Sequence, residues 1–88
     1  MAFFDAGQAN STLYIQNLNE RIAPQYMQKT LEEIFSEQGK VLQVIVKRRV
    51  ALRGQAFVVY PDVDTARVAL QAHQGERIYG KSMVIKYA

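Results

Sequence analysis

The segment RGQAFVVY, residues 53–60, contains a turn glycine followed by a strand that has apolar side chains on both faces. Gly54 is typical of a turn, and the β-branched and aromatic residues after it predict a strand that ends before Pro61. Alternate side chains of a strand point to opposite faces, so Phe57 is on the face opposite to Tyr60. Leaving a phenylalanine outside the core costs about 2 kcal/mol of burial. We therefore expect the second face of this sheet to bind a partner.

Composition limits the classes of protein to which the chain can belong. Its 88 residues suffice for one small domain, and the hydrophobic fraction of 49% supports a globular fold. The absence of cysteine excludes disulfides, thiolate zinc sites, iron–sulfur clusters and cysteine nucleophiles, and no cofactor or metal is expected. No apolar run approaches the length of a membrane span. Residues 1–10, including Phe3 and Phe4, are expected to be a flexible tail without signal-peptide character, and residues 11–88 the domain.

Periodicity and turn signals around this segment predict four strands and two helices. The expected elements are a strand at 12–18, a helix beginning at 24 and ending before Gly39, strands at 41–47 and 54–60, a helix starting near 62 and ending before Gly75, and a strand at 83–87 after a turn at Tyr79 and Gly80. The first helix has an apolar stripe of Met27, Leu31, Ile34 and Phe35. The second has Val63, Ala66, Ala69, Leu70 and His73, with Asp62 or Asp64 as its N-cap.

The element order β-α-β-β-α-β predicts an α+β, ferredoxin-like fold. Right-handed crossovers place both helices on one face of a four-stranded antiparallel sheet with strand order 4-1-3-2. Parity then assigns one set of strand residues to the core: Leu13, Ile15, Val44, Val46, Ala56, Val58, Met83 and Ile85. The opposite set faces solvent: Tyr14, Gln16, Gln43, Ile45, Gln55, Phe57, Val59, Val84 and Lys86. One face of the sheet is thus predicted to be open.

The open face combines the groups that single-stranded RNA requires. Tyr14 and Phe57 lie on adjacent central strands, and an aromatic ring stacks on a base for about 1–3 kcal/mol. Amide side chains, including Gln16, Asn17 and Gln55, can read base edges. Cations can hold phosphates. The net charge is only +3, but four positive charges, at Lys47, Arg48, Arg49 and Arg53, fall within seven residues. These features indicate RNA binding.

Two motifs resemble those of the RNA recognition motif family. RGQAFVVY resembles its RNP1 octamer and LYIQNL, residues 13–18, resembles its RNP2 hexamer; the resemblance covers residues 12–88. TLYIQNLNERI, the glutamine of RGQAF and IYGKSMVIKYA are similar to one spliceosomal subfamily, which contains the U1 snRNP A and U2 snRNP B″ proteins. That resemblance implies recognition of an snRNA hairpin whose loop bases splay across the sheet while the basic loop threads through the RNA loop.

The resemblance also implies roles for individual residues. Tyr14 and Phe57 match stacking aromatics, and Leu52 and Arg53 match the loop residues that insert into the RNA loop and contact the closing base pair. The full set of expected RNA contacts is Tyr14, Gln16, Asn17, Glu20, Arg21, Ile45, Lys47, Arg48, Arg49, Leu52, Arg53, Gln55, Phe57, Lys81, Val84, Lys86 and Tyr87. Lys81 is expected on the last strand. Ala23 and Pro24 replace lysines of the subfamily, and Lys86 replaces a glutamine.

The choice between the two spliceosomal types is left open, with the B″ type favoured. That type implies a leucine-rich-repeat A′ protein bound on the helical side, for which Tyr26, Lys29 and Glu33 are the candidate contacts. The alternative is an A-type protein that binds U1 snRNA without such a partner. Either type implies a nuclear location.

Two other classes of function remain. A protein-interaction module of the same fold is one; the sequence keeps both aromatic positions, which such modules usually lose. A small enzyme of the same topology, such as an acylphosphatase, needs a glycine-rich phosphate cradle after the first strand, and residues 15–24 lack one. His73, without a companion histidine, cysteine or carboxylate, is interpreted as structural. The chain is therefore predicted not to be an enzyme.

Overall fold

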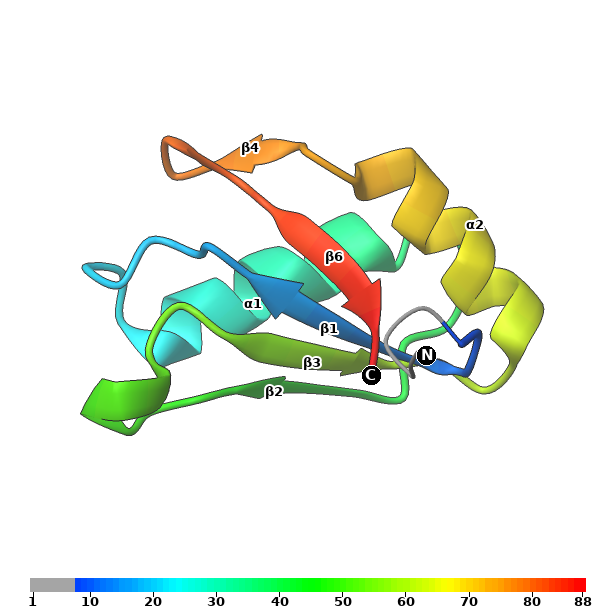
Figure 1. Ribbon diagram of the computed structural model, residues 1–88, viewed down its shortest axis with the longest axis horizontal. Coiled ribbons are helices and arrows are strands. Elements are labelled where there is room, and N and C mark those ends of the chain that lie inside the picture. Colours follow the sequence, from blue (N-terminus) through cyan, green and yellow to red (C-terminus); the bar gives the residue numbers. More distant parts are fainter. Residues whose placement is uncertain (1–7) are drawn as a thin grey trace.

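The strand β3 (Ala56–Val59) lies inside a four-stranded antiparallel sheet, between β2 (Gln43–Val46) and β1 (Thr12–Gln16), and β6 (Val84–Tyr87) pairs with the other side of β1 (Figure 1). The computed structural model describes residues 8–88. Its sheet order, β2-β3-β1-β6, confirms the predicted order 4-1-3-2 and the α+β, ferredoxin-like fold. The expectations for Phe3 and Phe4 lie outside the described residues.

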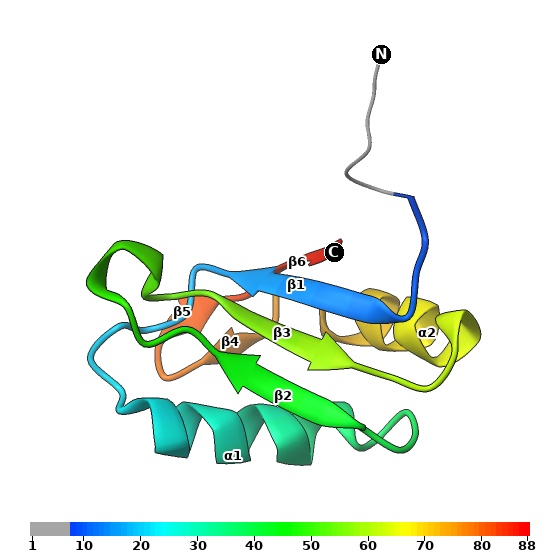
Figure 2. The same cartoon turned by 90° about the horizontal axis from the view of Figure 1, so that it is seen from below.

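Two helices cover one face of this sheet. α1 (Pro24–Phe35) follows β1, and α2 (Val63–His73) follows β3. In Figure 2, α1 lies below β2, and the chain leaving β3 turns into α2. The core between helices and sheet contains the fully buried side chains of Leu13, Ile15, Leu31, Phe35 and Val58. The predicted strand parity is confirmed, since Ala56, Met83 and Ile85 are buried as well.

The helix stripes are largely as predicted, with one exception. Met27, Leu31 and Phe35 of α1 are buried. In α2 the buried residues are Ala66, Ala69 and His73, whereas Val63 is 41% exposed, so its assignment to the core stripe was wrong. At 3.6 residues per turn, Val63 lies roughly 60° around the helix from Ala66, beyond the edge of the buried stripe.

Both helices begin with the predicted signals. Pro24 occupies the first turn of α1, where its missing N–H leaves no unsatisfied donor. Asp62, rather than Asp64, is the N-cap of α2, and its Oδ1 accepts a hydrogen bond from the Thr65 backbone N–H at 2.7 Å. The hydrogen bonds from Thr65 lower the pKa of the Asp62 carboxyl.

A short hairpin between α2 and β6 was missed by the sequence analysis. β4 (Arg77–Ile78) and β5 (Lys81–Ser82) pair across the predicted turn at Tyr79 and Gly80. Lys81 is therefore on this hairpin and not on the last strand of the sheet, which corrects the sequence-based expectation. Strands of two residues carry no periodicity that a sequence pattern could reveal.

The outer edge of β6 is closed by the segment that follows α2. The side chain of Gln74 donates to the carbonyl of Ile85 and accepts from its N–H, both at 2.7 Å, as a neighbouring strand would. Gly75 N–H donates to the carbonyl of Met83, and Met83 N–H donates to that of Glu76. This edge is consequently protected against pairing with another strand.

His73 is buried, but the expectation that no carboxylate accompanies it was wrong, because Glu76 is in contact with its ring. His73 is 4% exposed, packs against the ring of Phe35 with centroids 4.9 Å apart, and its Nδ1 and Nε2 lie 2.6 Å from Glu76 Oε1 and 2.7 Å from Gln38 Oε1. Residues 8–88 contain no group of three histidine, cysteine or acidic side chains placed to hold a metal. No helix in this part of the chain is long and apolar enough to cross a membrane.

Candidate nucleic-acid interface

A row of four side chains crosses the open face of the sheet, one from each strand. Phe57 of β3 is directly opposite Ile45 of β2 on one side and Tyr14 of β1 on the other, and Tyr14 is opposite Lys86 of β6. The rings of Tyr14 and Phe57 are tilted by 31° with centroids 5.1 Å apart. The register thus places the two predicted stacking aromatics side by side, with a cation next to them.

Phe57 is half-buried rather than fully exposed, because two neighbours cover part of its ring. One is Tyr14, and the other is Lys47, whose Nζ lies over the ring 5.1 Å from its centroid. Together with nearby side chains they form a shallow cavity of about 520 Å³, named here the aromatic cavity. Its lining residues are Tyr14, Lys47, Leu52, Gln55, Phe57, Lys86, Tyr87 and Ala88.

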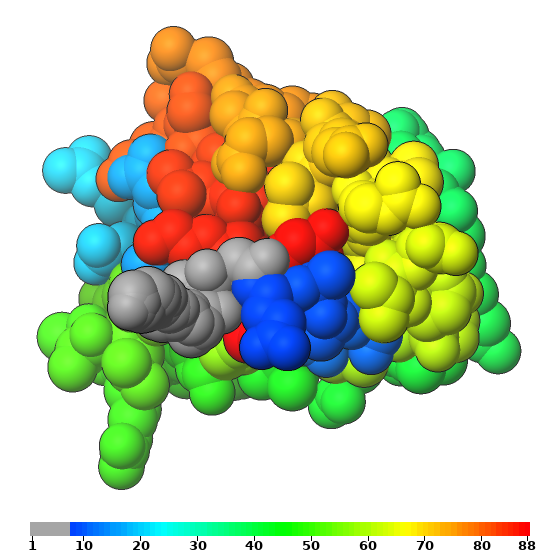
Figure 3. All heavy atoms as spheres, turned by 45° about the vertical axis from the view of Figure 1, so that its right-hand side comes forward, coloured from blue at the N-terminus to red at the C-terminus, as the bar shows by residue number. Residues whose placement is uncertain are grey.

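The segment between β2 and β3 projects from the body of the protein; Figure 3 shows it in green at the lower left. It contains a single 3₁₀ turn, Val50–Leu52, in which Leu52 N–H donates to the carbonyl of Arg49. Val50 is 77% exposed at its tip. The loop therefore presents an apolar tip between basic residues, and Val50 was missed as a candidate although an apolar residue within a basic run was visible in the sequence.

Gly54 ends this loop and fixes it against the segment that follows β1. Its φ is +82°, and a Cβ at this position would lie 3.2 Å from the carbonyl oxygen of Leu18. Its own carbonyl accepts a hydrogen bond from Leu18 N–H at 3.1 Å. The turn predicted at Gly54 therefore requires glycine both for backbone conformation and for close approach.

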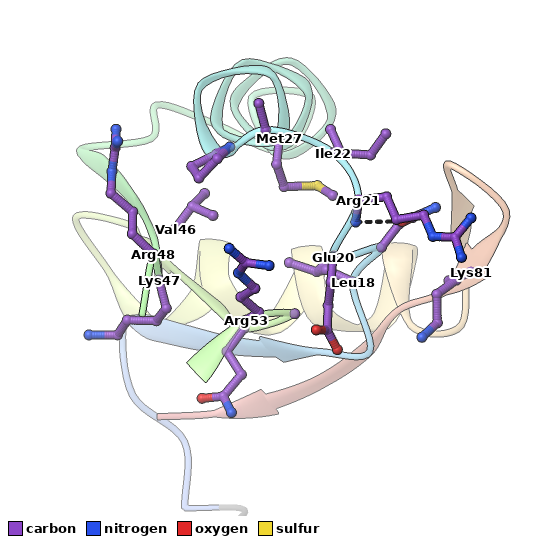
Figure 4. Close-up of a pocket in the computed structure, with 15 residues that line it drawn as sticks. Leu18, Glu20, Arg21, Ile22, Met27, Val46, Lys47, Arg48, Arg53 and Lys81 are labelled. Carbon is purple, nitrogen blue, oxygen red and sulfur yellow. Dashed lines mark hydrogen bonds between the residues drawn. The ribbon is translucent and has the colours of Figure 1, made fainter. Parts of the chain in front are cut away.

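A second, larger cavity of about 950 Å³ opens between this loop, the β1–α1 loop and the start of α1, and is named here the cationic cavity (Figure 4). Five of its lining residues carry positive charge, namely Arg21, Lys47, Arg48, Arg53 and Lys81, and Glu20 is its one acidic lining residue. In Figure 4 Arg53 lies between Lys47 and Arg48 on one side and Arg21 and Lys81 on the other.

Part of the wall of the cationic cavity is apolar. It includes Ile22, Met27 and Val46, from the β1–α1 loop, α1 and β2. The sequence pattern predicts Met27 and Val46 only as core residues and gives no signal for Ile22, because a linear sequence does not show that three separate elements meet at one surface. No ion pair within residues 8–88 involves the five cations of this cavity.

Two asparagines fix the β1–α1 loop to the β4–β5 hairpin. Asn17, with φ of +66°, donates its amide to the carbonyl of Ser82 at 2.8 Å, and Asn19 donates to that of Tyr79 at the same distance. Asn19 also accepts from the backbone N–H of Arg21. One amide hydrogen of Asn17 is thus used structurally, and the hairpin brings Lys81 to the cationic cavity.

The remaining sequence-predicted residues lie outside these two cavities. Gln16 and Val84 are a cross-strand pair on the open face next to the aromatic row, and Arg49 is exposed on the projecting loop. Tyr26, Lys29 and Glu33, the candidate partner contacts, are exposed residues of α1; Tyr26 is 61% exposed.

Comparison with known proteins identifies the family. The RNA recognition motif family matches residues 13–84. The chain is 40% identical over 79 residues to U1 small nuclear ribonucleoprotein A of Drosophila melanogaster. This match covers 90% of this chain and 37% of that protein. It is 39% identical over 84 residues to U1 small nuclear ribonucleoprotein usp102 of Schizosaccharomyces pombe, covering 96% of this chain and 34% of the relative. Identity to U2 small nuclear ribonucleoprotein B″ of Arabidopsis thaliana is 39% over 79 residues, or 90% and 34% of the two chains.

The chain spans about a third of the length of the curated relatives that it matches. Its similarity to both U1 and U2 proteins agrees with the subfamily inferred from its motifs and leaves the type unresolved. The match places the chain among binding modules rather than enzymes, as the sequence predicted. The protein belongs to the RNA recognition motif family.

Proposed function

We propose that this protein binds the loop of an RNA hairpin on its open sheet face, as a component of a nuclear, spliceosomal small nuclear ribonucleoprotein. The observation that carries this proposal is the Tyr14–Phe57 pair, half-buried at the centre of the open sheet face and next to two cavities that contain cations. An enzyme or a structural module has no need of aromatic rings in that position. A base has two apolar faces and stacks on such rings whatever its identity.

The two cavities support different parts of this recognition. In the aromatic cavity, Tyr14 and Phe57 would stack bases while Gln55 and Lys86 approach their edges. In the cationic cavity, the guanidinium groups of Arg21 and Arg48 would hold phosphates of the stem or loop. Because Lys47 and Gln55 line both cavities, one RNA strand can run from the first to the second.

The projecting loop supports recognition of a hairpin rather than of a linear strand. Residues 47–53 combine positive charge with the apolar Val50 and Leu52, so the loop can enter a ring of splayed nucleotides and contact both backbone and bases. Arg53 stands at the base of this loop, centrally in the cationic cavity, where a planar donor fork could bind the base pair that closes an RNA loop (Figure 4).

We further propose the U2 B″-like type, with a leucine-rich-repeat A′-type partner on the helical side. The feature in its favour is the exposed Tyr26, which shares one side of α1 with Lys29 and Glu33. The alternative is a U1 A-like protein without this partner.

The test is purification of the tagged protein from its own cells, after cross-linking, with sequencing of the bound RNA and identification of bound protein. A Tyr14→Ala/Phe57→Ala double variant serves as the matched control for sheet-dependent binding. U2 snRNA with a leucine-rich-repeat protein supports the B″-like type, and U1 snRNA without one supports the A-like type. Recovery of no small nuclear RNA, or equal recovery with the control, contradicts the proposal. A pool of RNA hairpins with randomised loops then defines the preferred loop in vitro.

A further inference from the structure

Lys47 occupies the position that separates the two cavities. It lines both the aromatic cavity and the cationic cavity, and it is half-buried while Arg48 and Arg49 beside it are exposed. Its ammonium is placed over the ring of Phe57, 5.1 Å from the centroid. The side chain that the sequence predicts as a phosphate ligand therefore lies, in the free protein, over the ring on which the proposed function places a base.

The contact is one that a base can displace. A cation over a partly exposed ring shifts the equilibrium toward the contact by only about 2- to 5-fold, which is less than the gain from a stacked base. No ion pair or side-chain hydrogen bond within residues 8–88 holds the ammonium of Lys47. The backbone of Lys47, in contrast, is fixed, because its N–H donates to the carbonyl of Gln55 at 3.1 Å. Only the flexible stem has to move.

We propose that the Lys47 side chain is a displaceable cover of the Phe57 ring. When a base stacks on the ring, the side chain moves away and its ammonium binds an RNA phosphate beside the cationic cavity. This inference rests on the proposed function for its second step. It assigns Lys47 two successive roles. In the free protein the cation shields an apolar ring from solvent, and in the complex the same charge contributes to the salt dependence of binding.

The first arm of the test uses the free protein and nuclear magnetic resonance. The ε-methylene protons of Lys47, assigned through Lys47→Ala, lie near the face of an aromatic ring and should resonate upfield of those of the other lysines. Phe57→Leu, which removes the ring and keeps an apolar side chain, should return them to the ordinary position. Unshifted Lys47 resonances in the wild type would refute the claim that Lys47 covers Phe57 in the free protein, whether or not the protein binds RNA.

The second arm uses the hairpin selected from the randomised pool. At saturation the Lys47 resonances should lose their upfield shift, and persistence of the shift in the complex contradicts displacement. Failure to select any hairpin counts against the proposed function and, with it, the displacement step; the first arm still decides the cover in the free protein.

A pair of charge-matched variants tests the same proposal independently, through RNA affinity. Lys47→Ala and Arg48→Ala each remove one positive charge from the cationic cavity, but only the first uncovers Phe57. At high salt, where phosphate contacts contribute least, Lys47→Ala should bind about 2- to 5-fold more tightly than Arg48→Ala. Equal or weaker binding by Lys47→Ala contradicts the proposal.

Discussion

Replacing Phe57 by alanine should separate RNA binding from folding, because this ring is at the surface and not in the core. Phe57 is half-buried, and its main aromatic contact is the tilted pair with Tyr14 at 5.1 Å. Such a pair contributes about 0.5–1.5 kcal/mol beyond area burial. We therefore expect the free energy of unfolding to fall by about 1–2 kcal/mol, well below the roughly 3–5 kcal/mol typical of truncating a core phenylalanine.

The loss of RNA-binding free energy in Phe57→Ala should be larger than this loss of folding stability. A base stacked on an aromatic ring contributes about 1–3 kcal/mol, so the dissociation constant for the selected hairpin should rise roughly 5- to 150-fold. Fluorescence anisotropy with labelled RNA measures the affinity, and urea unfolding measures the stability of the same preparation. Phe57→Leu should lose most of the same affinity, because it keeps apolar volume without an aromatic face.

Val59→Ala is the matched control, since Val59 lies on the same strand and the same face but pairs with Thr12 and Gln43, away from the aromatic cavity. It should bind within about 2-fold of the wild type, because it removes no stacking ring. Binding of Phe57→Ala that matches the wild type, or an equal loss in Val59→Ala, would refute the stacking role assigned to Phe57.

Three further predictions address the cationic cavity and the frame that supports the sheet. Arg53→Ala should cost about 1–3 kcal/mol of binding free energy, because Arg53 is assigned to a base pair. Arg48→Ala should mainly lower the slope of log K against log salt concentration by about 0.7–0.9. Identical losses of affinity and identical salt slopes in the two variants would count against this division. Gln74→Ala should lower the free energy of unfolding by about 1–3 kcal/mol, because the N–H and carbonyl of Ile85 lose their partners; a urea midpoint equal to that of the wild type would show that water replaces them. Burial raises the pKa of the Tyr60 hydroxyl, so its neutral form stabilises the fold below about pH 10, and this contribution is lost as pH rises further. Tyr60→Phe should therefore lessen the fall in stability at alkaline pH, and an unchanged pH profile of stability would argue against this role of Tyr60.

Strand parity and topology were enough to predict the aromatic row from the sequence. β1 and β3 alternate cleanly, so placing Leu13 and Val58 in the core necessarily puts Tyr14 and Phe57 on the open face. The strand order then makes these two residues neighbours, and the register confirms it. Local periodicity determines this part of the interface, and a single sequence contains it.

The cationic cavity could be predicted only in part, because its walls come from distant segments. The run of basic residues was visible, but the apolar wall depends on Ile22, Met27 and Val46 meeting in space. The placement of Lys81 depends on the β4–β5 hairpin, which is held by hydrogen bonds from Asn17 and Asn19, more than 55 residues earlier in the chain. No local pattern encodes such contacts.

The covering of Phe57 was also beyond the reach of pattern analysis. Parity placed Phe57 on the solvent face and Lys47 at the start of a basic loop, but not the ammonium over the ring. That arrangement depends on the direction of the Lys47 side chain, which strand parity does not determine. It changes the interpretation of Lys47 from a simple phosphate ligand to a residue that binding has to move.

Mapping of the RNA-binding surface at residue resolution tests the central claim most directly. Backbone and aromatic resonances of the full chain should be followed by nuclear magnetic resonance while the selected hairpin is added to saturation. The largest changes should fall on β1, β3 and the 47–53 loop, with Tyr14 and Phe57 ring protons among them, while the exposed side of α1 around Tyr26 stays unchanged. Changes confined to α1 and α2, with the two rings unaffected, would contradict the assignment of RNA binding to the open sheet face.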